Sequence, residues 1–236
     1  TQHSALSTSM NTAIIVAAGS GKRFGGKTPK QFLEIIGKPL IIHTIQRFET
    51  CPEIGEIILV LPAPESARFL QIAGKYGLKK ISKIVGGGET RAESVWNGLR
   101  AIRPATAEIV AVHDGARPLV TGEEIAETVK KAREAGAACL VSTVTDTIKE
   151  VENGKIARTI DRSTLRRALT PQCFRYEILR RAFENADLSE AATDECFLVE
   201  KLGQEIATVE GSARNIKITH AEDLILAESL LKQTAL

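Results

Sequence analysis

Short apolar runs alternate with amphipathic stretches over the first 144 residues of the chain. Apolar residues at helical spacing predict helices after Pro39, Thr90 and Thr121, and a further helix that ends near Gly77. The apolar runs between them are rich in β-branched residues and too short for a helix, so they predict buried strands at 13–16, 56–61, 81–85, 109–112 and 138–144. This repeated alternation predicts a parallel sheet with helices on both faces.

The expected fold class is therefore α/β, a Rossmann-like three-layer sandwich around a mostly parallel central sheet. The helices that begin at Thr90 and Thr121 each carry a glutamate three residues on, which is the spacing of a capping box. Ligands of such sheets lie outside the carboxyl ends of the strands. At this edge we expect the glycine-rich loop after the first strand, the glycines at 86–88 and the segment that begins with His113.

The alternation stops at 145–165. Residues 148–152 and 155–160 flank Asn153 and Gly154, a pair that is typical of a two-residue hairpin turn. We therefore expect a protruding β-hairpin arm at about 145–165, and a lone hairpin is only marginally stable in water. The arm therefore needs a surface to pack against, and the sequence leaves open whether its own domain or a second subunit provides it.

The C-terminal part returns to helical patterns at 176–186 and 194–202. A strand is expected at 206–209, and Thr219 with Glu222 is expected to cap the last helix. We find no internal repeat or linker, so residues 10–236 are expected to form a single domain. Met10 is the only methionine, so we expect translation of the natural protein to start there and residues 1–9 to be an addition that is not part of it; intact-mass analysis of the natural protein tests this.

Composition and charge narrow the function classes. The net charge of +2 argues against a nucleic-acid partner, because such proteins usually have a strongly basic domain or stripe. No apolar run is long enough to cross a bilayer, so no membrane partner is expected. The four cysteines are widely spaced without a C-x-x-C pair, which favours buried free thiols in a reducing compartment and hence a cytoplasmic protein.

A basic loop rich in glycine, residues 17–31, follows the first strand. Glycines let the backbone approach a ligand without a Cβ atom in the way. The loop also contains Lys22, Arg23, Lys27 and Lys30 without an intervening acid. Together with exposed backbone N–H groups, these cations favour the binding of a polyphosphate. The alternative is a solvated basic loop between strand and helix.

Residues 21–28 of this loop also have the spacing of a Walker A motif, and Asp114 resembles the acidic residue that holds its metal. Two features argue against a P-loop NTPase. Thr28 precedes Pro29, which disfavours the helical backbone of a Walker A threonine. Gly19 and Ser20 also separate the motif from the strand.

Further motifs occur in a fixed order and cover nearly everything after Met10. Together they resemble the 2-C-methyl-D-erythritol 4-phosphate cytidylyltransferase family, one of the nucleotidyltransferases that act on sugar and polyol phosphates. The motifs are Ala17-Ala18-Gly19-x-Gly21-x-Arg23, Pro29-Lys30-Gln31, Gly87-Gly88-x-x-Arg91-x-x-Ser94, His113-Asp114-x-Ala116-Arg117-Pro118, Asp161-Arg162, Thr170-Pro171-Gln172, Thr193-Asp194 and Asn215-Ile216-Lys217-Ile218-Thr219.

The resemblance implies an enzyme that joins CTP to methylerythritol phosphate and releases pyrophosphate, in the non-mevalonate isoprenoid pathway. The acceptor phosphate would attack the α-phosphorus of CTP in line, so catalysis needs positioning and fixed positive charge rather than a protein nucleophile. The implied catalytic residues are Arg23, Lys30, Asp114 and Lys217. The implied nucleotide-binding residues are Ala17, Ala18, Gly19, Gly21, Gly87, Gly88, Ser94 and Gly115.

By the same resemblance, Asp114 binds Mg²⁺, an ion that needs few protein ligands. The acceptor would be held by Arg117, Thr147 and Lys217, with Arg162 and Thr170 donated across a homodimer by the arm. Each of these side chains taken alone could equally be an ordinary surface residue.

Three neighbouring positions are interpreted as supporting the site. Arg91 is expected to pair with Glu89, and His113 to orient its loop rather than act as a base. Gly115 stands where the family often has alanine, so this loop is expected to be looser.

Two other functions stay open. A ribitol 5-phosphate cytidylyltransferase would have the same CTP loop, although such enzymes tend to carry Ala-Gly-Gly rather than Ala17-Ala18-Gly19 and differ around residues 161–165. A regulator that binds nucleotide without turnover would not need the set formed by Arg23, Lys30, Asp114 and Lys217.

Overall fold

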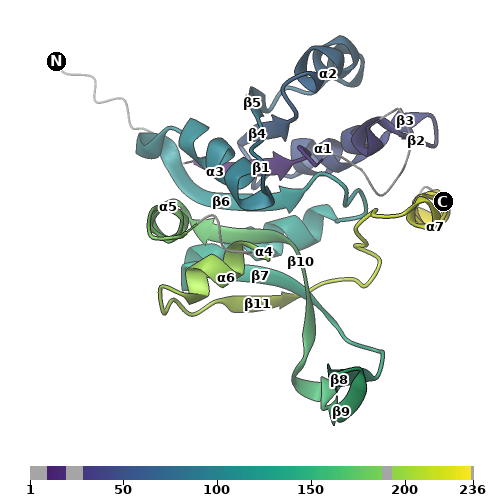
Figure 1. Cartoon of the computed structure of the whole chain (residues 1–236). Helices are drawn as coiled ribbons and strands as arrows, with labels where there is room; N and C mark the ends of the chain where they lie inside the picture. Colours follow the sequence, from purple (N-terminus) through teal and green to yellow (C-terminus); the bar gives the residue numbers. More distant parts are fainter. Residues whose placement is uncertain (1–9, 20–28, 188–192, 235–236) are drawn as a thin grey trace.

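The computed structural model describes residues 10–19, 29–187 and 193–234, and its centre is a seven-stranded sheet (Figure 1). The strand order is β11-β7-β10-β6-β1-β4-β5, and all neighbours are parallel except in the two pairs that contain β10. The strands are β1 (Met10–Val16), β4 (Glu56–Leu61), β5 (Ile81–Gly86), β6 (Ala107–Asp114), β7 (Ala137–Thr143), β10 (Arg166–Arg175) and β11 (Ala207–Glu210). The predicted mostly parallel sheet is confirmed.

Helices cover both faces of this sheet, which confirms the three-layer prediction. One face packs against α1 (Leu40–Thr50), α2 (Glu65–Ala73) and α4 (Gly122–Ala135). The other packs against α3 (Arg91–Ala101), α5 (Tyr176–Glu184) and α6 (Glu195–Glu200). Because side chains alternate along a strand, Ile15 belongs to the first core and Ile14 to the second.

A third, smaller core lies beside the main sheet. It joins α7 (Ala221–Thr234) to the short hairpin of β2 (Glu34–Ile35) and β3 (Lys38–Pro39). Ile218, just before α7, is fully buried in it. This packing fixes the segment that precedes α7. Among the described residues, no helix has both the length and the apolar composition of a membrane span.

Two of the three predicted helix caps are confirmed. Thr90 and Thr121 each accept a hydrogen bond from the backbone of the glutamate three residues on, whose side chain returns the bond. The cap predicted at Thr219 with Glu222 is wrong. The carboxylate of Asp223 instead accepts from the backbone N–H groups of Thr219 and His220, because α7 begins one residue later than expected.

Strand β10 was not predicted, although it lies between β6 and β7 in the middle of the sheet. Its sequence contains Pro171, and proline cannot donate to a strand ladder, which argues against a central strand. In the structure the pairing with β7 is interrupted between Ala168 and Gln172, so the proline falls in a gap of that ladder. This interruption is what lets proline occupy a central strand.

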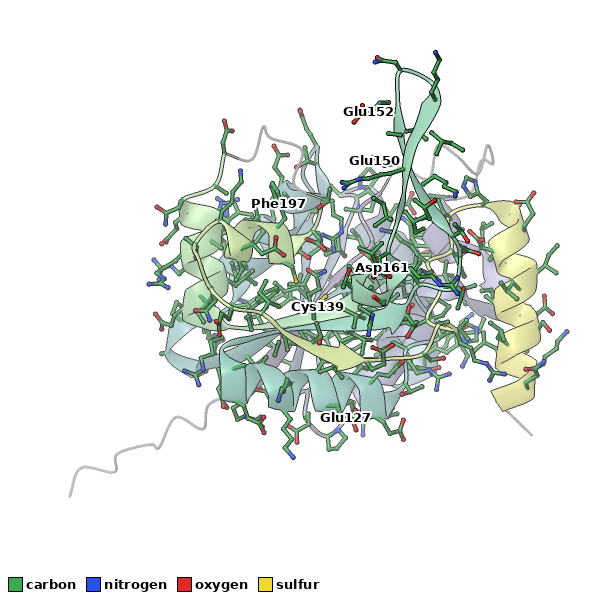
Figure 2. The ribbon with its side chains drawn as sticks, turned by 90° about the horizontal axis from the view of Figure 1, so that it is seen from below. Glu127, Cys139, Glu150, Glu152, Asp161 and Phe197 are labelled. Carbon is green, nitrogen blue, oxygen red and sulfur yellow. The ribbon has the colours of Figure 1, made fainter. Side chains whose placement is uncertain are left out.

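The predicted arm is confirmed as the hairpin of β8 (Ile148–Glu152) and β9 (Lys155–Ile160). Asn153 and Gly154 both have positive φ, as a two-residue turn of this kind requires. The arm projects away from the sheet in Figure 1 and again in Figure 2, where Glu150 and Glu152 mark it. Val151 and Ile156 are 60% and 66% exposed, so the arm does not bury them on its own domain.

The order of the strands also locates a crevice. From β1 the chain proceeds to β4 and β5 on one side, and β6 then returns to the other side of β1. The carboxyl ends of β1 and β6 are aligned, with Val16 opposite Asp114. Open α/β sheets bind ligands at such a point of reversal.

Candidate active site

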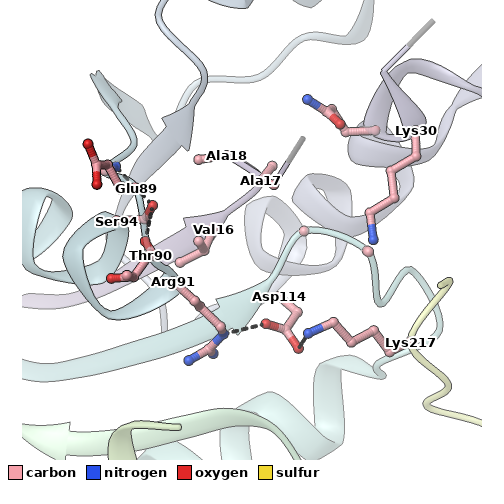
Figure 3. A pocket seen from close by; sticks show the side chains of 15 residues that line it. Val16, Ala17, Ala18, Lys30, Glu89, Thr90, Arg91, Ser94, Asp114 and Lys217 are labelled. Carbon is pink, nitrogen blue, oxygen red and sulfur yellow. Dashed lines mark hydrogen bonds and ion pairs between the residues drawn. The ribbon is translucent and has the colours of Figure 1, made fainter. Parts of the chain in front are cut away.

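A cavity of about 440 Å³ opens at the carboxyl ends of β1 and β6 (Figure 3). Its wall contains nine of the predicted site residues: Ala17, Ala18, Gly19, Lys30, Gly88, Ser94, Asp114, Gly115 and Lys217. Arg91 lines it as well. Residues 20–28 lie outside the described part of the chain, and the predictions for Gly21 and Arg23 fall there.

Asp114 is the centre of the charges in this cavity. Its Oδ1 accepts from Arg91 Nε at 3.1 Å, and its Oδ2 accepts from Arg117 Nε at 3.2 Å and Lys217 Nζ at 3.0 Å. Burial alone would raise the pKa of Asp114, but the charges of Arg91, Lys217 and Arg117 hold it well below the usual range. The carboxylate is therefore ionised at any physiological pH.

Arg91 does not pair with Glu89, contrary to our prediction. Its Nη1 donates to Oε1 of Glu195 at 2.6 Å while its Nε contacts Asp114, so the guanidinium joins two carboxylates. Burial acts to lower the pKa of Arg91, but the charges of Glu195 and Asp114 raise it. Figure 3 shows Arg91 pointing from α3 toward Asp114, away from Glu89.

Sequence reasoning missed Glu195. It lies in the first turn of α6, is 1% exposed, and is more than a hundred residues from Arg91 in the chain. Burial raises the pKa of Glu195, and the charge of Arg91 opposes this shift. The available signal was its position directly after the Thr193-Asp194 motif, to which no role had been given.

Two lysines approach the cavity from different segments. Lys30 lies in a single 3-10 turn, residues 30–32, and its Nζ donates to the carbonyl of Ile218 at 3.0 Å. Lys217 is 38% exposed and reaches Asp114 from the segment before α7. The turn at Lys30 leads to the β2–β3 hairpin rather than into an α-helix. The Walker A match, residues 21–28, lies outside the described part of the chain, but the residues that follow it form this turn and hairpin rather than the α-helix that a P-loop leads into, which argues against the P-loop interpretation.

The glycines after β5 allow a close approach between two loops. A Cβ atom at Gly87 would lie 2.2 Å from Cβ of Ala18, and one at Gly88 would lie 2.4 Å from Cβ of Glu93. The Ser94 hydroxyl accepts from the Gly88 N–H at 3.1 Å and donates to the Thr90 carbonyl at 2.9 Å. Ser94 thus holds the loop against the start of α3.

Gly115 is packed tightly, so the expected loosening of its loop is wrong. Its N–H donates to the Val16 carbonyl at 2.8 Å, and its own carbonyl accepts from the Thr44 hydroxyl at 2.9 Å. A Cβ atom here would lie 2.8 Å from Cβ of Ala17 and 2.9 Å from Cδ1 of Ile41. Glycine therefore lets the loops after β1 and β6 pack side by side.

Three further residues of the motifs lie beneath Asp114. Arg117 is buried, and its Nη1 donates to the Asn215 carbonyl at 2.8 Å. We predicted that the arm would donate Thr170, but this residue lies in β10 and is buried within its own chain. Its hydroxyl accepts from the Asp114 N–H at 3.2 Å and lies 3.0 Å from Nδ1 of His113. Thr170 is therefore fully occupied within its own subunit.

The arm carries two predicted acceptor residues that do not line this cavity. Thr147 and Arg162 are both exposed. The guanidinium of Arg162 donates to the Thr145 carbonyl at the base of the arm. Neither side chain lines the cavity of its own subunit, so their predicted role depends on a second subunit.

His113 is fully buried, and burial lowers its pKa to about 4. Between pH 6.5 and 4 the unfolded chain therefore binds a proton at this residue and the folded chain does not. We expect acidification across this interval to lower the free energy of unfolding by about 3 kcal/mol through His113 alone. Urea unfolding at a series of pH values measures this dependence. A His113→Asn variant should lose it, and an unchanged slope in that variant would contradict the assignment.

Asp114 is the residue that could hold a metal ion. No group of three or more His, Cys, Asp or Glu side chains in residues 10–19, 29–187 and 193–234 is placed to bind one. Mg²⁺, however, often takes one or two carboxylates and completes its shell with substrate phosphates and water. Three of the roughly four lone-pair directions of Asp114 accept from cations, which leaves one on Oδ1. The residues present fit an ion of this kind.

A family model and named relatives match nearly the whole chain. A family model described as "IspD: 2-C-methyl-D-erythritol 4-phosphate cytidylyltransferase" matches residues 11–233. A protein of that name from Alkaliphilus metalliredigens is 44% identical over 94% of this chain and 93% of its own length. One from Geobacter metallireducens is 41% identical over 94% of this chain and 97% of its own length.

Solved structures agree with these relatives. The crystal structure of 4-diphosphocytidyl-2C-methyl-D-erythritol synthase from Anaerococcus prevotii superposes with a TM-score of 0.84 at 30% identity, covering 95% of this chain and 96% of that chain. Family match, sequence identity and structural likeness all extend over nearly the whole chain. The chain therefore belongs to the 2-C-methyl-D-erythritol 4-phosphate cytidylyltransferase family of nucleotidyltransferase enzymes.

Proposed function

We propose that this chain catalyses the reaction for which its family is named, the joining of CTP and 2-C-methyl-D-erythritol 4-phosphate to give CDP-methylerythritol and pyrophosphate. An oxygen of the acceptor phosphate attacks the α-phosphorus of CTP, and the bond from that phosphorus to the β-phosphate oxygen breaks. The observation that supports this best is Asp114, which three cations surround in a cavity at the carboxyl edge of the sheet.

The charge that this reaction needs comes from fixed cations. Lys30 and Lys217 reach the cavity from segments almost 190 residues apart, so they can contact the triphosphate from different directions. Arg23 and the amides of the glycine-rich loop are proposed to complete this set. Because both reacting groups are anions, positive charge held in place lowers the barrier more than a protein nucleophile would. The Ser94 hydroxyl, engaged with Gly88 and Thr90, is not arranged as a nucleophile.

We propose Mg²⁺ as the ion at Asp114. When bound, it neutralises phosphate oxygens and favours departure of pyrophosphate. Asp114 offers one remaining lone-pair direction, and Lys217, which is partly exposed, can leave Asp114 for a phosphate oxygen. Arg91 and Arg117 keep the carboxylate ionised and fixed.

The nucleoside is proposed to lie between the loops after β1 and β5. Backbone groups of Ala17, Ala18 and Gly88, with the Ser94 hydroxyl, read the edge of cytosine. Backbone amides and carbonyls suit this task because cytosine presents both a donor and acceptors on one edge. Gly19 leaves room for the ring, since a Cβ atom there would have nothing within 4 Å, whereas Gly87 and Gly115 let the loops around the nucleoside pack closely.

The arm is proposed to complete the acceptor site of a second subunit in a homodimer. Its exposed Val151 and Ile156 would then be covered, and Arg162 and Thr147 would reach the partner's acceptor phosphate and hydroxyls. Lys217 would hold the same phosphate from within the subunit, and Arg117, which was expected to share this role, would instead act by fixing Asp114 from its buried position.

Mixing two inactive variants tests this arrangement. Arg162→Ala and Lys30→Ala subunits are expected to be inactive alone, and to recover about a quarter of wild-type activity after exchange at equal concentrations. Recovery follows because half of the dimers are then mixed, and each has one intact site only if Arg162 acts across the interface. Pyrophosphate release and light scattering measure activity and oligomeric state, and no recovery from exchanged dimers would place Arg162 in its own subunit's site.

The reaction itself is tested by pyrophosphate release with Mg²⁺ and CTP, comparing methylerythritol phosphate with ribitol 5-phosphate. We expect release that depends on methylerythritol phosphate. A preference for ribitol 5-phosphate would keep the mechanism and change the pathway, and CTP binding without any release would favour a regulator.

The cysteines are four buried free thiols, which suits the cytoplasmic location that we also propose.

A further inference from the structure

Glu195 is a buried carboxylate whose surroundings suggest more than packing. Oε1 accepts from Arg91 Nη1 at 2.6 Å, whereas Oε2 is buried without a hydrogen-bond partner. Buried polar atoms are nearly always paired, so an unpaired carboxylate oxygen beside a functional cavity calls for an explanation. Packing alone would be served better by an apolar side chain of the same size.

The backbone that carries Glu195 is held in place independently of Arg91. The amide oxygen of Gln172, on β10, accepts from the backbone N–H groups of Glu195 and Cys196 at 3.2 and 3.1 Å. The amide nitrogen of Gln172 donates to Asp194 at 2.8 Å. These hydrogen bonds join β10 to the start of α6. The Glu195 side chain therefore reaches Arg91 from a fixed backbone position.

The contact with Glu195 decides how Arg91 meets Asp114. Arg91 gives Asp114 only its Nε, while its Nη1 is held by Glu195. An arginine without that second partner commonly forms a two-pronged contact with a carboxylate. Because Arg117 and Lys217 already occupy Oδ2, the second prong would fall on the lone-pair direction of Oδ1 that is otherwise left for a metal ion.

We propose that Glu195 is a positioning residue: by binding Arg91, it limits Arg91 to a single contact with Asp114 and so keeps that carboxylate able to bind a divalent metal with the nucleotide. This inference rests on the proposed function of the site. Glu195 also sets the charge of the cluster. Two carboxylates and three cations give a net charge of +1, which suits anionic substrates.

The test is the affinity of the protein for Mn²⁺ in the presence of CTP and without acceptor, followed by the loss of the free-ion signal in electron paramagnetic resonance. Glu195→Gln keeps the size of the side chain and removes its charge. We expect about 10- to 100-fold weaker Mn²⁺ binding, the usual effect of losing an outer partner of a metal ligand. Glu200→Gln, on the exposed end of the same helix, is the matched control and should bind as the wild type does.

Steady-state assays separate positioning from a merely structural role. In Glu195→Gln, the Mg²⁺ concentration for half-maximal activity should rise by the same factor, while kcat at saturating Mg²⁺ should approach the wild-type value. Because Glu195 acts through Arg91, adding Glu195→Gln to an Arg91→Lys protein should cause little further loss, whereas additive losses would overturn the proposal. Circular dichroism identifies a variant that fails to fold, in which case Glu195→Asp, with its shorter side chain, takes its place in the same assay.

Mn²⁺ affinity equal to that of Glu200→Gln in a folded Glu195 variant would overturn the inference. That result leaves the proposed function intact as long as the wild type releases pyrophosphate. A wild type without release in the presence of both substrates would instead contradict the proposed function itself.

Discussion

Replacement of Asp114 by asparagine is expected to cause the largest loss of stability of any change in the cavity. Asparagine keeps the shape but leaves three cations facing a neutral group. Arg117, which is buried and otherwise contacts only a carbonyl there, would lose its counter-charge. Breaking a buried ion pair on one side typically costs about 3–5 kcal/mol. Urea unfolding at neutral pH measures this loss.

The same substitution should lower kcat/KM by about 10³-fold, because the proposed metal ligand is removed together with the charge that orients Lys217. Glu127→Gln is a suitable control, since Glu127 is exposed on α4 and does not line the cavity. Native-like stability in Asp114→Asn would show that Arg117 does not depend on this carboxylate. The pH dependence has a definite sign: Asp114, whose pKa is depressed, stabilises the fold above its unfolded pKa near 4 and loses this effect as the pH falls below it.

Replacement of Lys30 by alanine is expected to lower kcat by about 10²–10³-fold, with a smaller change in KM for CTP. The reason is that a fixed positive charge near the α-phosphate is worth most in the transition state, where negative charge accumulates. The Nζ of Lys30 donates to the Ile218 carbonyl at 3.0 Å, which holds it beside the cavity. Single-turnover measurements of pyrophosphate release separate this effect from product release.

A matched control for Lys30 lies eight residues further on. Lys38, on β3, donates to Gln46 at 2.6 Å and does not line the cavity, so Lys38→Ala should retain the wild-type kcat. A Lys30→Ala enzyme whose KM rises without any fall in kcat would show that Lys30 binds substrate and transition state equally.

Most of the fold could be read from short-range patterns. Buried parallel strands are apolar throughout, and β4 with five buried residues in succession is an example. Capping boxes depend on residues three apart, and those at Thr90 and Thr121 were predicted correctly. Strand β10 could not be read in this way, because its place between β6 and β7 and the gap that admits Pro171 are set by partners distant in sequence.

The same distinction between local patterns and distant contacts applies to the residues of the site. Residues at the ends of predicted strands, such as Ala17 and Asp114, could be expected to meet because parallel strands end at one edge. The partner of Arg91 could not, since a local glutamate was available at position 89 while the observed one, Glu195, comes from a different helix. Ion pairs between distant segments leave no periodic trace in a sequence, and the role of the arm equally depends on a neighbour that one chain does not contain.

The antiparallel insertion of β10 has a consequence for synthesis on the ribosome. Strands β1, β4 and β5 can pair with their neighbours soon after they emerge, and β6 then pairs with β1. The other edge of β6, and the facing edge of β7, have no native partner until Arg166–Arg175 has been made. Open strand edges are prone to pairing with other chains. The nascent chain is therefore most exposed to aggregation while the arm is being translated.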